Sequence, residues 1–221
     1  FVLTNSPVGD ESFGISVYIS KAYDNGMDWS VGYAYTDAED VSPMTSSVAF
    51  SNYQNRAFFD PQETVLSRSN YSIDHRITAT FKWEANFWRD YTTQISAYGH
   101  YNRGVPYSRT FNGTRSPYGF TPYLDFNDNV LRPGAVRNSE DGSWWGKVDL
   151  RISQELPGLI DGHSASAFLV IDNFTNFLND DWGILRQANF PFTVDEDRTN
   201  PESRRGDASR YEIRMGLSYS F

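Results

Sequence analysis

Histidine and cysteine are the first residues to examine for chemistry in this 221-residue chain, because both bind metals and act as bases or nucleophiles. The three histidines, His75, His100 and His163, are far apart in the sequence and form no pair with metal-ligand spacing. We interpret each as an ordinary side chain on a strand or at its end. Cysteine is absent, which excludes a disulfide framework and thiolate catalysis.

Oxygen ligands for calcium are present, but not in a complete pattern. Asp125, Asn127 and Asn129 have the spacing that begins a calcium-binding loop. Such a loop requires a glycine and a glutamate where this chain has Val130 and Val136. We therefore expect no cofactor, with calcium in a folded loop as an open alternative. Two acidic groups could hold it there, although solvated loop charge is the preferred interpretation: Asp180–Asp181 and Asp195–Asp197.

Enzyme motifs are missing from the sequence. No GxSxG, P-loop or GxGxxG pattern occurs at a strand–helix junction. Carboxylate pairs for glycoside hydrolysis are not excluded by spacing, but none lies in a convincing group at strand ends. The net charge of −9 argues against a nucleic-acid partner, which needs a basic face. We predict that the chain is not an enzyme.

The clearest structural pattern is the final stretch, from Arg210 to Phe221. A strand sends successive side chains to opposite faces, so this stretch predicts a strand with one apolar and one polar face. Membrane barrel strands have this pattern, with the apolar row toward lipid, and so do strands of soluble sheets with one wet face. The apolar row consists of Tyr211, Ile213, Met215, Leu217, Tyr219 and Phe221.

Six earlier segments also have strand patterns. In the last of them the two faces are least distinct, because Phe168 and Val170 share parity with serines. Asp24–Gly26 is a hairpin turn signal, and a short connection through Asn86 is expected between the third and fourth segments. The predicted strands are Phe13–Tyr23, Met27–Asp37, Ser72–Trp83, Tyr91–Asn102, Trp145–Glu155 and His163–Asn173.

The connections between these strands alternate between short turns and long loops. The loops span Ala38–Tyr71, Arg103–Ser143 and Phe174–Ser209, far above the usual median of about 4–6 residues. Outer-membrane barrels have short periplasmic turns and long extracellular loops. Tilted strands of about 11 residues, rising about 3.3 Å each, span the apolar band of about 25 Å.

Composition favours the same class of protein. Aromatic residues make up 16% of the chain, while the mean hydropathy is only −0.56. This combination is typical of half-polar strands with aromatic girdles. No run approaches 18 apolar residues, which excludes a membrane-spanning helix. We predict an antiparallel transmembrane β-barrel in a bacterial outer membrane, with a secreted carbohydrate-binding β-sandwich as the alternative.

Charged and aromatic side chains mark two candidate functional sets. Seven charged residues fall on the polar rows and would face the barrel lumen: Arg76, Lys82, Lys147, Asp149, Arg151, Glu212 and Arg214. Buried charges must be paired, so we expect a ladder of ion pairs between these side chains and a group inside the barrel. Five aromatic residues of the second loop offer contact surface for a ligand, or pack the loops over the barrel mouth: Tyr107, Phe111, Tyr118, Phe120 and Tyr123.

Four segments resemble the carboxyl-terminal part of TonB-dependent outer-membrane receptors, and the Oar-like subgroup in particular. They are YNRGVPYSRTFNG (101–113), WGKVDLRISQELPG (145–158), IDNFTNFLNDDWG (171–183) and RYEIRMGLSYSF (210–221). The terminal strand alone is shared by most outer-membrane barrels, but the order of all four segments is more specific. The resemblance covers nearly the whole chain from about Phe13 onward.

The resemblance implies a 22-stranded barrel, of which residues 1–221 would supply about the last seven strands. It implies energised uptake of a scarce ligand, of large or peptidic cargo in this subgroup, across a Gram-negative outer membrane. The expected partners are lipid, a plug domain, the TonB energising complex and the barrel-assembly machinery. The plug and TonB box are not in this sequence. The lumen charges would contact the plug, and some contacts would yield when it moves. The implied assembly signal is Ile213, Met215, Leu217, Tyr219 and Phe221.

The number of strands leaves two membrane alternatives. Bacterial single-chain barrels use an even number of strands, whereas seven are predicted here. Phe1–Asn5 could complete a small eight-stranded adhesin or anchor, but it is short and Pro7 follows closely. The amino terminus does not have the pattern of a signal peptide, so we expect a mature chain or a fragment. An arc of a larger barrel is the preferred interpretation.

Overall fold

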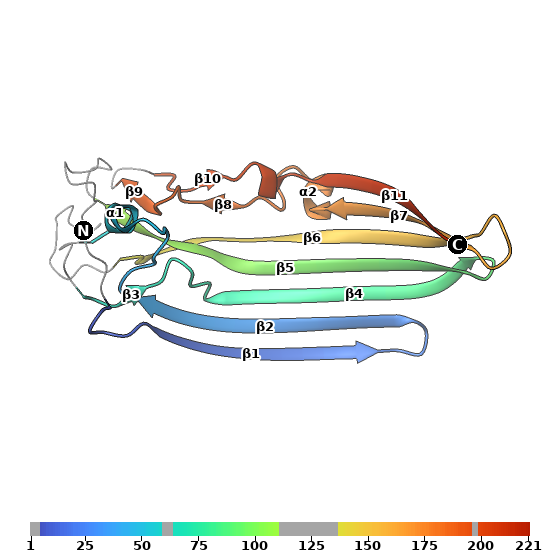
Figure 1. Ribbon diagram of the computed structural model, residues 1–221, viewed down its shortest axis with the longest axis horizontal. Coiled ribbons are helices and arrows are strands. Elements are labelled where there is room, and N and C mark those ends of the chain that lie inside the picture. Colours follow the sequence, from blue (N-terminus) through green and yellow to red (C-terminus); the bar gives the residue numbers. More distant parts are fainter. Residues whose placement is uncertain (1–4, 59–63, 111–136, 196–198) are drawn as a thin grey trace.

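The structure is a computed structural model that describes residues 5–58, 64–110, 137–195 and 199–221. Each of its seven long strands pairs antiparallel with the next long strand along the chain (Figure 1). The predictions of an all-β chain and of seven strands are therefore confirmed. In spatial order the strands are β1 (Glu11–Ala22), β2 (Met27–Asp40), β4 (His75–Trp88), β5 (Tyr91–Thr110), β6 (Glu140–Pro157), β7 (Ser164–Asp172) and β11 (Glu212–Ser220).

All short elements lie in the long connections. β3 pairs with β2, β9 runs parallel to β5, and β8 pairs with β10. The two short helices were not expected from the sequence. None of the described helices is both long and apolar enough to cross a membrane. The short elements are α1 (Ala49–Gln54), β3 (Ser67–Arg68), α2 (Phe174–Leu178), β8 (Arg186–Gln187), β9 (Thr193–Asp195), β10 (Ser203–Arg204) and the 3₁₀ helix η1 (Asp207–Ser209).

Short and long connections lie at opposite ends of the sheet. The turns β1–β2, β4–β5 and β6–β7 lie at the right of Figure 1, where the chain also ends. The connections β2–β4, β5–β6 and β7–β11 lie at the left or extend toward it. We call these the short-turn end and the long-connection end. The alternation of loop lengths therefore separates the connections spatially.

The strand register gathers the alternating apolar residues on one face of the sheet. Ile15 lies opposite Tyr35, and Tyr33 lies opposite Ile77 on the next strand. The exposed fraction is 56% for Ile15 and 80% for Leu217, so no described segment covers these side chains. In a β-sandwich such rows would face a second sheet. This apolar face includes Phe13, Ile15, Val17, Ile19, Val31, Tyr33, Ile77, Phe81, Ile95, Val148, Leu150, Ile152, Leu169, Ile213, Met215 and Leu217.

The β7 segment shows weak alternation in the sequence because one of its large apolar residues, Phe168, points to the polar face of the sheet. Phe168 lies on this polar face, opposite Gly216 of β11 and Ser153 of β6. A Cβ atom on Gly216 would lie only 2.4 Å from Cζ of Phe168, so the glycine provides the space that the ring occupies. The guanidinium of Arg151 lies over the same ring, 5.1 Å from its centre. Phe168 is therefore accommodated on the polar face by the space at Gly216 and by a cation–π contact with Arg151.

Buried apolar side chains are concentrated near the long-connection end rather than on the sheet. Tyr107, Ala188 and Val194 pack together with Phe192 against them. This small cluster joins the far end of β5 to the third long connection. The described buried apolar residues are Ala57, Phe58, Tyr107, Ile171, Ala188 and Val194.

The sheet is open at both edges in the described part of the chain. β1 pairs only with β2, and β11 pairs only with β7. Closure into a barrel and the number of its strands are therefore not established by the fold. The segment Phe1–Asn5, considered above as an eighth strand, lies outside the described residues except for Asn5.

Several strands differ in length from the sequence prediction. β4 continues to Trp88, so the connection expected at Asn86 is a turn at Arg89–Asp90, in which Arg89 has a φ of 53°. β5 and β6 extend far into the expected second loop. There β5 pairs with the short strand β9 of the third connection. The residues of this part show no clear alternation of apolar and polar side chains, so the sequence did not predict a strand.

A glycine contact bends this long hairpin. Gly104 lies opposite Gly142, and the register shifts on both sides of this pair. A Cβ atom on Gly104 would lie 2.7 Å from the carbonyl oxygen of Ser143 and 2.8 Å from the carbonyl carbon of Gly142. Irregular registers of this kind bend strands. The two backbones therefore approach more closely here than side chains would permit.

Replacing Gly104 by alanine should destabilise the protein. We expect the free energy of unfolding to fall by about 1–3 kcal/mol, because the new methyl group must displace backbone rather than a flexible side chain. Urea unfolding followed by tryptophan fluorescence would measure the change. Gly9→Ala is the control, because a Cβ atom there meets nothing within 4 Å. Equal stability of the two variants would contradict the steric explanation.

Candidate functional site

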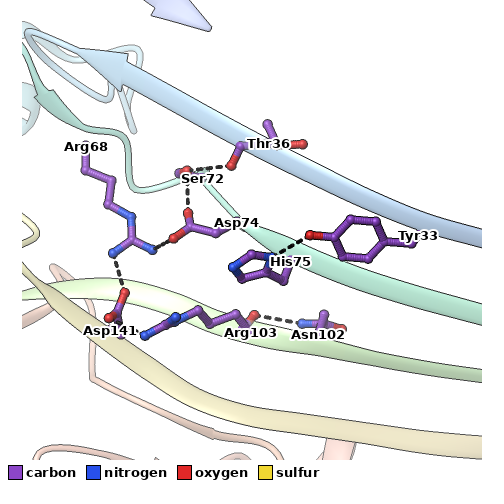
Figure 2. A network of polar contacts seen from close by, with 9 residues as sticks. All are labelled: Tyr33, Thr36, Arg68, Ser72, Asp74, His75, Asn102, Arg103 and Asp141. Carbon is purple, nitrogen blue, oxygen red and sulfur yellow. Dashed lines mark hydrogen bonds and ion pairs between the residues drawn. The ribbon is translucent and has the colours of Figure 1, made fainter. Parts of the chain in front are cut away.

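Four charged residues from different strands and connections meet at the long-connection end. Arg68, on β3, forms ion pairs with Asp74, just before β4, and with Asp141 on β6. Asp141 also accepts a hydrogen bond from Arg103 of β5. Figure 2 shows this loop-end network, which we define as Arg68, Asp74, Arg103 and Asp141. The connection between β2 and β4 is thereby tied to the β5–β6 hairpin.

The charge on Arg68 is stabilised by its two carboxylate partners. Burial lowers the pKa of this guanidinium, but hydrogen bonds and charge attraction from Asp74 and Asp141 outweigh the effect, so the pKa is raised. Asp74 is itself oriented by the hydroxyl of Ser72, at 3.1 Å. The Ser72 hydroxyl also lies 3.5 Å from the carbonyl oxygen of Thr36 on β2 (Figure 2). The two carboxylates therefore stabilise the charged form of Arg68, and Ser72 connects Asp74 to β2.

A second polar contact, deeply buried, ties the β5–β6 hairpin to β2. The Arg137 and Asp40 side chains are only 3% and 10% exposed, and they form an ion pair. Arg137 also donates to the carbonyl oxygen of Asp40 at 2.7 Å. Beside it, the Asn138 side chain donates to Asn70 at 2.6 Å and to the carbonyl oxygen of Arg68 at 2.8 Å. Both connections are thus held by polar contacts rather than by an apolar core.

The third long connection joins this assembly. Glu202 accepts hydrogen bonds from the backbone N–H of Ser143, at 2.9 Å, and from its hydroxyl. The N–H of Ser108 in β5 donates to the carbonyl oxygen of Phe192 at 2.9 Å. The three long connections are therefore interlocked at one end of the sheet.

A hollow of about 390 Å³ lies on the polar face next to the loop-end network. His100 and Asn102 are held by a hydrogen bond of 2.9 Å between Nδ1 and Oδ1. The Trp145 ring meets the His100 ring edge-on, with 4.6 Å between their centres. Leu185 and Gln187 contribute from the third connection. Its lining on the sheet includes Arg76, Tyr98, His100, Asn102, Arg103 and Trp145.

The predicted lumen charges all lie on the polar face, and most have partners along it. Lys147 pairs with Asp149 at 2.9 Å, whereas Arg76 has no ion-pair or hydrogen-bond partner among the described residues. The remaining four contact neighbours on the same face: Lys82 pairs with Glu84, Arg151 covers Phe168, and Arg214 pairs with Glu212 and Asp172. Contacts with a plug stay a prediction.

The five loop aromatics can be placed only in part. Tyr107 is 5% exposed and belongs to β5, where it packs against Ala188 and Val194. Burial and the charge of Glu140 raise the pKa of its hydroxyl, although Arg109 opposes the shift. Tyr107 therefore packs the loops and offers a ligand little surface. The other four, Phe111, Tyr118, Phe120 and Tyr123, lie outside the described residues.

The residues of the expected assembly signal lie on the apolar row of β11 and beyond it. Their exposed fractions reach 81% at Met215 and 98% at Phe221. The Tyr219 hydroxyl is anchored at the short-turn end by Nδ1 of His163, at 2.9 Å, and by the N–H of Leu159, at 3.3 Å. His163 therefore fixes the end of the last strand. The remaining members, Ile213 and Leu217, also face outward.

The other two histidines have different surroundings. Nδ1 of His75 lies 2.9 Å from the Tyr33 hydroxyl, and its ring stacks near Trp144 (Figure 2 shows the Tyr33 contact). His100 belongs to the hollow. Within the described residues, no group of three or more His, Cys, Asp or Glu side chains could hold a metal.

The candidate calcium residues are not brought together in the described structure. Asp180 and Asp181 lie in an exposed turn after α2, where the N–H of Asp181 donates to the side chain of Asn179 at 2.8 Å. The residues Asp125, Asn127, Asn129, Val130, Val136, Glu196 and Asp197, and the side chain of Asp195, lie outside the described part.

The sequence analysis missed the loop-end network and most of the hollow. Arg68, Arg103 and Asp141 lie in segments predicted as loops, where charge is ordinarily solvated, and Asp74 lies near the start of the predicted strand Ser72–Trp83. A signal that could have found them is the presence of charged residues at the ends of strands that must meet. Comparisons with protein-family models, curated proteins and solved structures give no match for this chain. The expected receptor family is therefore a proposal.

Substituting Asp141 by asparagine should weaken the loop-end network. We expect the free energy of unfolding to fall by about 1 kcal/mol, because two arginines lose a charged partner at a site that is partly exposed. Urea unfolding would measure the change. Glu84→Gln is the control, since the exposed Lys82–Glu84 pair should contribute less. A larger effect at Glu84 than at Asp141 would contradict this ranking.

Proposed function

We propose that this chain forms part of the wall of an outer-membrane β-barrel that takes up a ligand, as TonB-dependent receptors do. The single observation that carries the proposal is the apolar face, which runs across all seven long strands. Exposing so much apolar surface to water would be unfavourable in free energy. Residues as apolar as Met215 and Leu217 are 81% and 80% exposed. Large exposed apolar surfaces mark membrane or protein contact sites.

The position of a barrel wall, with lipid on one side and a lumen on the other, fits both faces of the sheet. Hydrocarbon would cover the apolar face, and the paired strands satisfy their backbone groups internally, as a bilayer demands. The opposite face holds ion pairs such as Lys147–Asp149, which suit an aqueous or protein-filled lumen. The open edges at β1 and β11 would need further strands, because unpaired edges are not stable in lipid. This favours an arc of a larger barrel.

The long-connection end supports a receptor role for this wall. Three connections are interlocked there by the Arg68–Asp141 and Arg137–Asp40 pairs and by Glu202 with Ser143, so they would form a shaped structure at the barrel mouth. Binding residues commonly lie on loops that a rigid scaffold positions. Together with the order of the four receptor-like segments, this favours ligand capture on the outer side. Energy from a TonB complex and gating by a plug belong to the same proposal.

The lipid contact can be tested with single cysteines, since the chain has none of its own. Leu150→Cys and Ile152→Cys lie on the apolar face, while Arg151→Cys and Ser153→Cys alternate with them on the polar face. Each would be labelled with an environment-sensitive NBD fluorophore in phosphatidylcholine vesicles. We expect blue-shifted emission at 150 and 152, quenched by spin-labelled acyl chains. At 151 and 153 we expect quenching by aqueous iodide.

Alternation of the quenching between positions 150–153 is the result that supports a membrane-spanning wall. Equal quenching at all four positions, or failure of the protein to enter vesicles, would overturn a membrane-spanning wall. A secreted sandwich would remain in solution without lipid or detergent. If the protein does enter lipid, its intact mass in detergent distinguishes a larger receptor from a small barrel of about the mass of this chain.

Phe221 should matter for assembly and not for the folded state. Its side chain is 98% exposed, so Phe221→Ala should leave urea unfolding unchanged. If the terminal strand is an assembly signal, the amount of protein in the outer-membrane fraction should fall several-fold. Leu159→Ala is the control, because this residue is 89% exposed at the same end of the sheet. Equal losses in both variants would contradict a specific signal.

A further inference from the structure

The hollow beside the loop-end network has an unusual charge. The whole chain carries a net charge of −9, yet the lining contains two arginines and a histidine and no carboxylate. One of these arginines, Arg103, is neutralised by Asp141. Arg76 is exposed on the polar face and has no partner within the described part of the chain. A single unbalanced cation therefore faces this space.

Arg76 differs from Lys147 and Arg214, which have carboxylate partners on the polar face, and from Arg151, which has no ion pair among the described residues but lies over the Phe168 ring. Lys147 has Asp149, and Arg214 has Asp172 and Glu212. The residues opposite Arg76 on β2 and β5 are Ala34 and Asn102, neither of which carries a charge, and the nearby carboxylate of Asp74 is paired with Arg68. An arginine presents its donors in a planar fork that matches a carboxylate or a phosphate. An oxyanion would therefore match Arg76.

The walls of the hollow suit a ring. Trp145 is fixed edge-on to His100, with 4.6 Å between ring centres, and Tyr98 lies on the other side of His100 at 6.4 Å. His100 is held in turn by Asn102, which is only 5% exposed. These contacts fix the aromatic surfaces before any ligand arrives. Rigid aromatic walls beside a few polar groups are typical of small-molecule sites.

We infer that this hollow binds a ring-bearing oxyanion, with the carboxylate or phosphate on Arg76 and the ring against Trp145. The inference rests on the proposed function, because it assigns a ligand class to the lumen side of the wall. The volume of about 390 Å³ accommodates one ring with its anionic group and leaves room for further atoms of a ligand. It would then be a subsite for part of a larger ligand or for a small one.

Saturation-transfer NMR on the full-length protein in deuterated detergent tests the inference. The probes are benzoate and phenyl phosphate, with neutral benzamide as the matched ring lacking a charge. We expect transfer to at least one of the two anions and at least fivefold less to benzamide. The anion that gives the stronger signal identifies whether the site takes a carboxylate or a phosphate.

Variants connect the signal to the hollow. Arg76→Gln should reduce the anion signal at least fivefold, and Arg76→Lys should retain part of it. Arg214→Gln is the control, because Arg214 lies on the same face but is paired. Trp145→Phe should keep binding, whereas Trp145→Ala should weaken it. The inference would be overturned if the parent protein gives no anion signal, or if the signal is unchanged in Arg76→Gln. The first result is also the one expected if a carboxylate of the protein itself pairs with Arg76.

The fluorophore pattern at positions 150–153 separates the two failures. If that pattern alternates and the probes do not bind, the membrane wall stands and only the ligand site is wrong. If the pattern does not alternate, the proposed function fails whatever the probes do. The same pattern in Arg76→Gln shows that the variant is folded.

Discussion

Side chains alternate along a strand with a period of two, so a slip of one residue between neighbours would move an entire apolar row to the polar face. Every pairing in this sheet depends on that constraint, from Ile15 opposite Tyr35 to Leu217 opposite Ala167. One register produces a continuous apolar face on seven strands. A shift of one residue would bring charges such as Arg151 and Arg214 to that face.

The two ends of the sheet are stabilised in different ways. At the short-turn end the chain needs little beyond tight turns and the contact between His163 and Tyr219. At the long-connection end, ion pairs and amide hydrogen bonds surround only a small apolar cluster at Tyr107, Ala188 and Val194. Buried polar groups are costly unless they are satisfied, and satisfied networks specify one arrangement. Arg137 with Asp40 and Arg68 with Asp141 therefore position the connections at this end of the sheet.

The hollow results from these constraints acting together. The Gly104–Gly142 contact bends the hairpin where it leaves the regular sheet, and the network at Arg103 holds it there. Arg76 lies on a strand whose neighbours offer it no carboxylate in the described structure. An unbalanced cation beside fixed aromatic rings is more naturally a binding group than a stabilising one, because an ion pair within the wall would have served stability better.

The sequence by itself determined the strands, their two faces and the separation of long from short connections. Alternation of apolar and polar residues is a local property, and it is present in each segment, as in Trp145–Glu155. Only the tertiary structure decided the length of the β5–β6 hairpin, the burial of Tyr107 and the meeting of Arg68 with Asp141. These contacts join residues far apart in the chain, such as Arg68 and Asp141, which are separated by 73 positions. No periodicity records such pairs, because charges in loops look alike in the sequence whether they are solvated or paired.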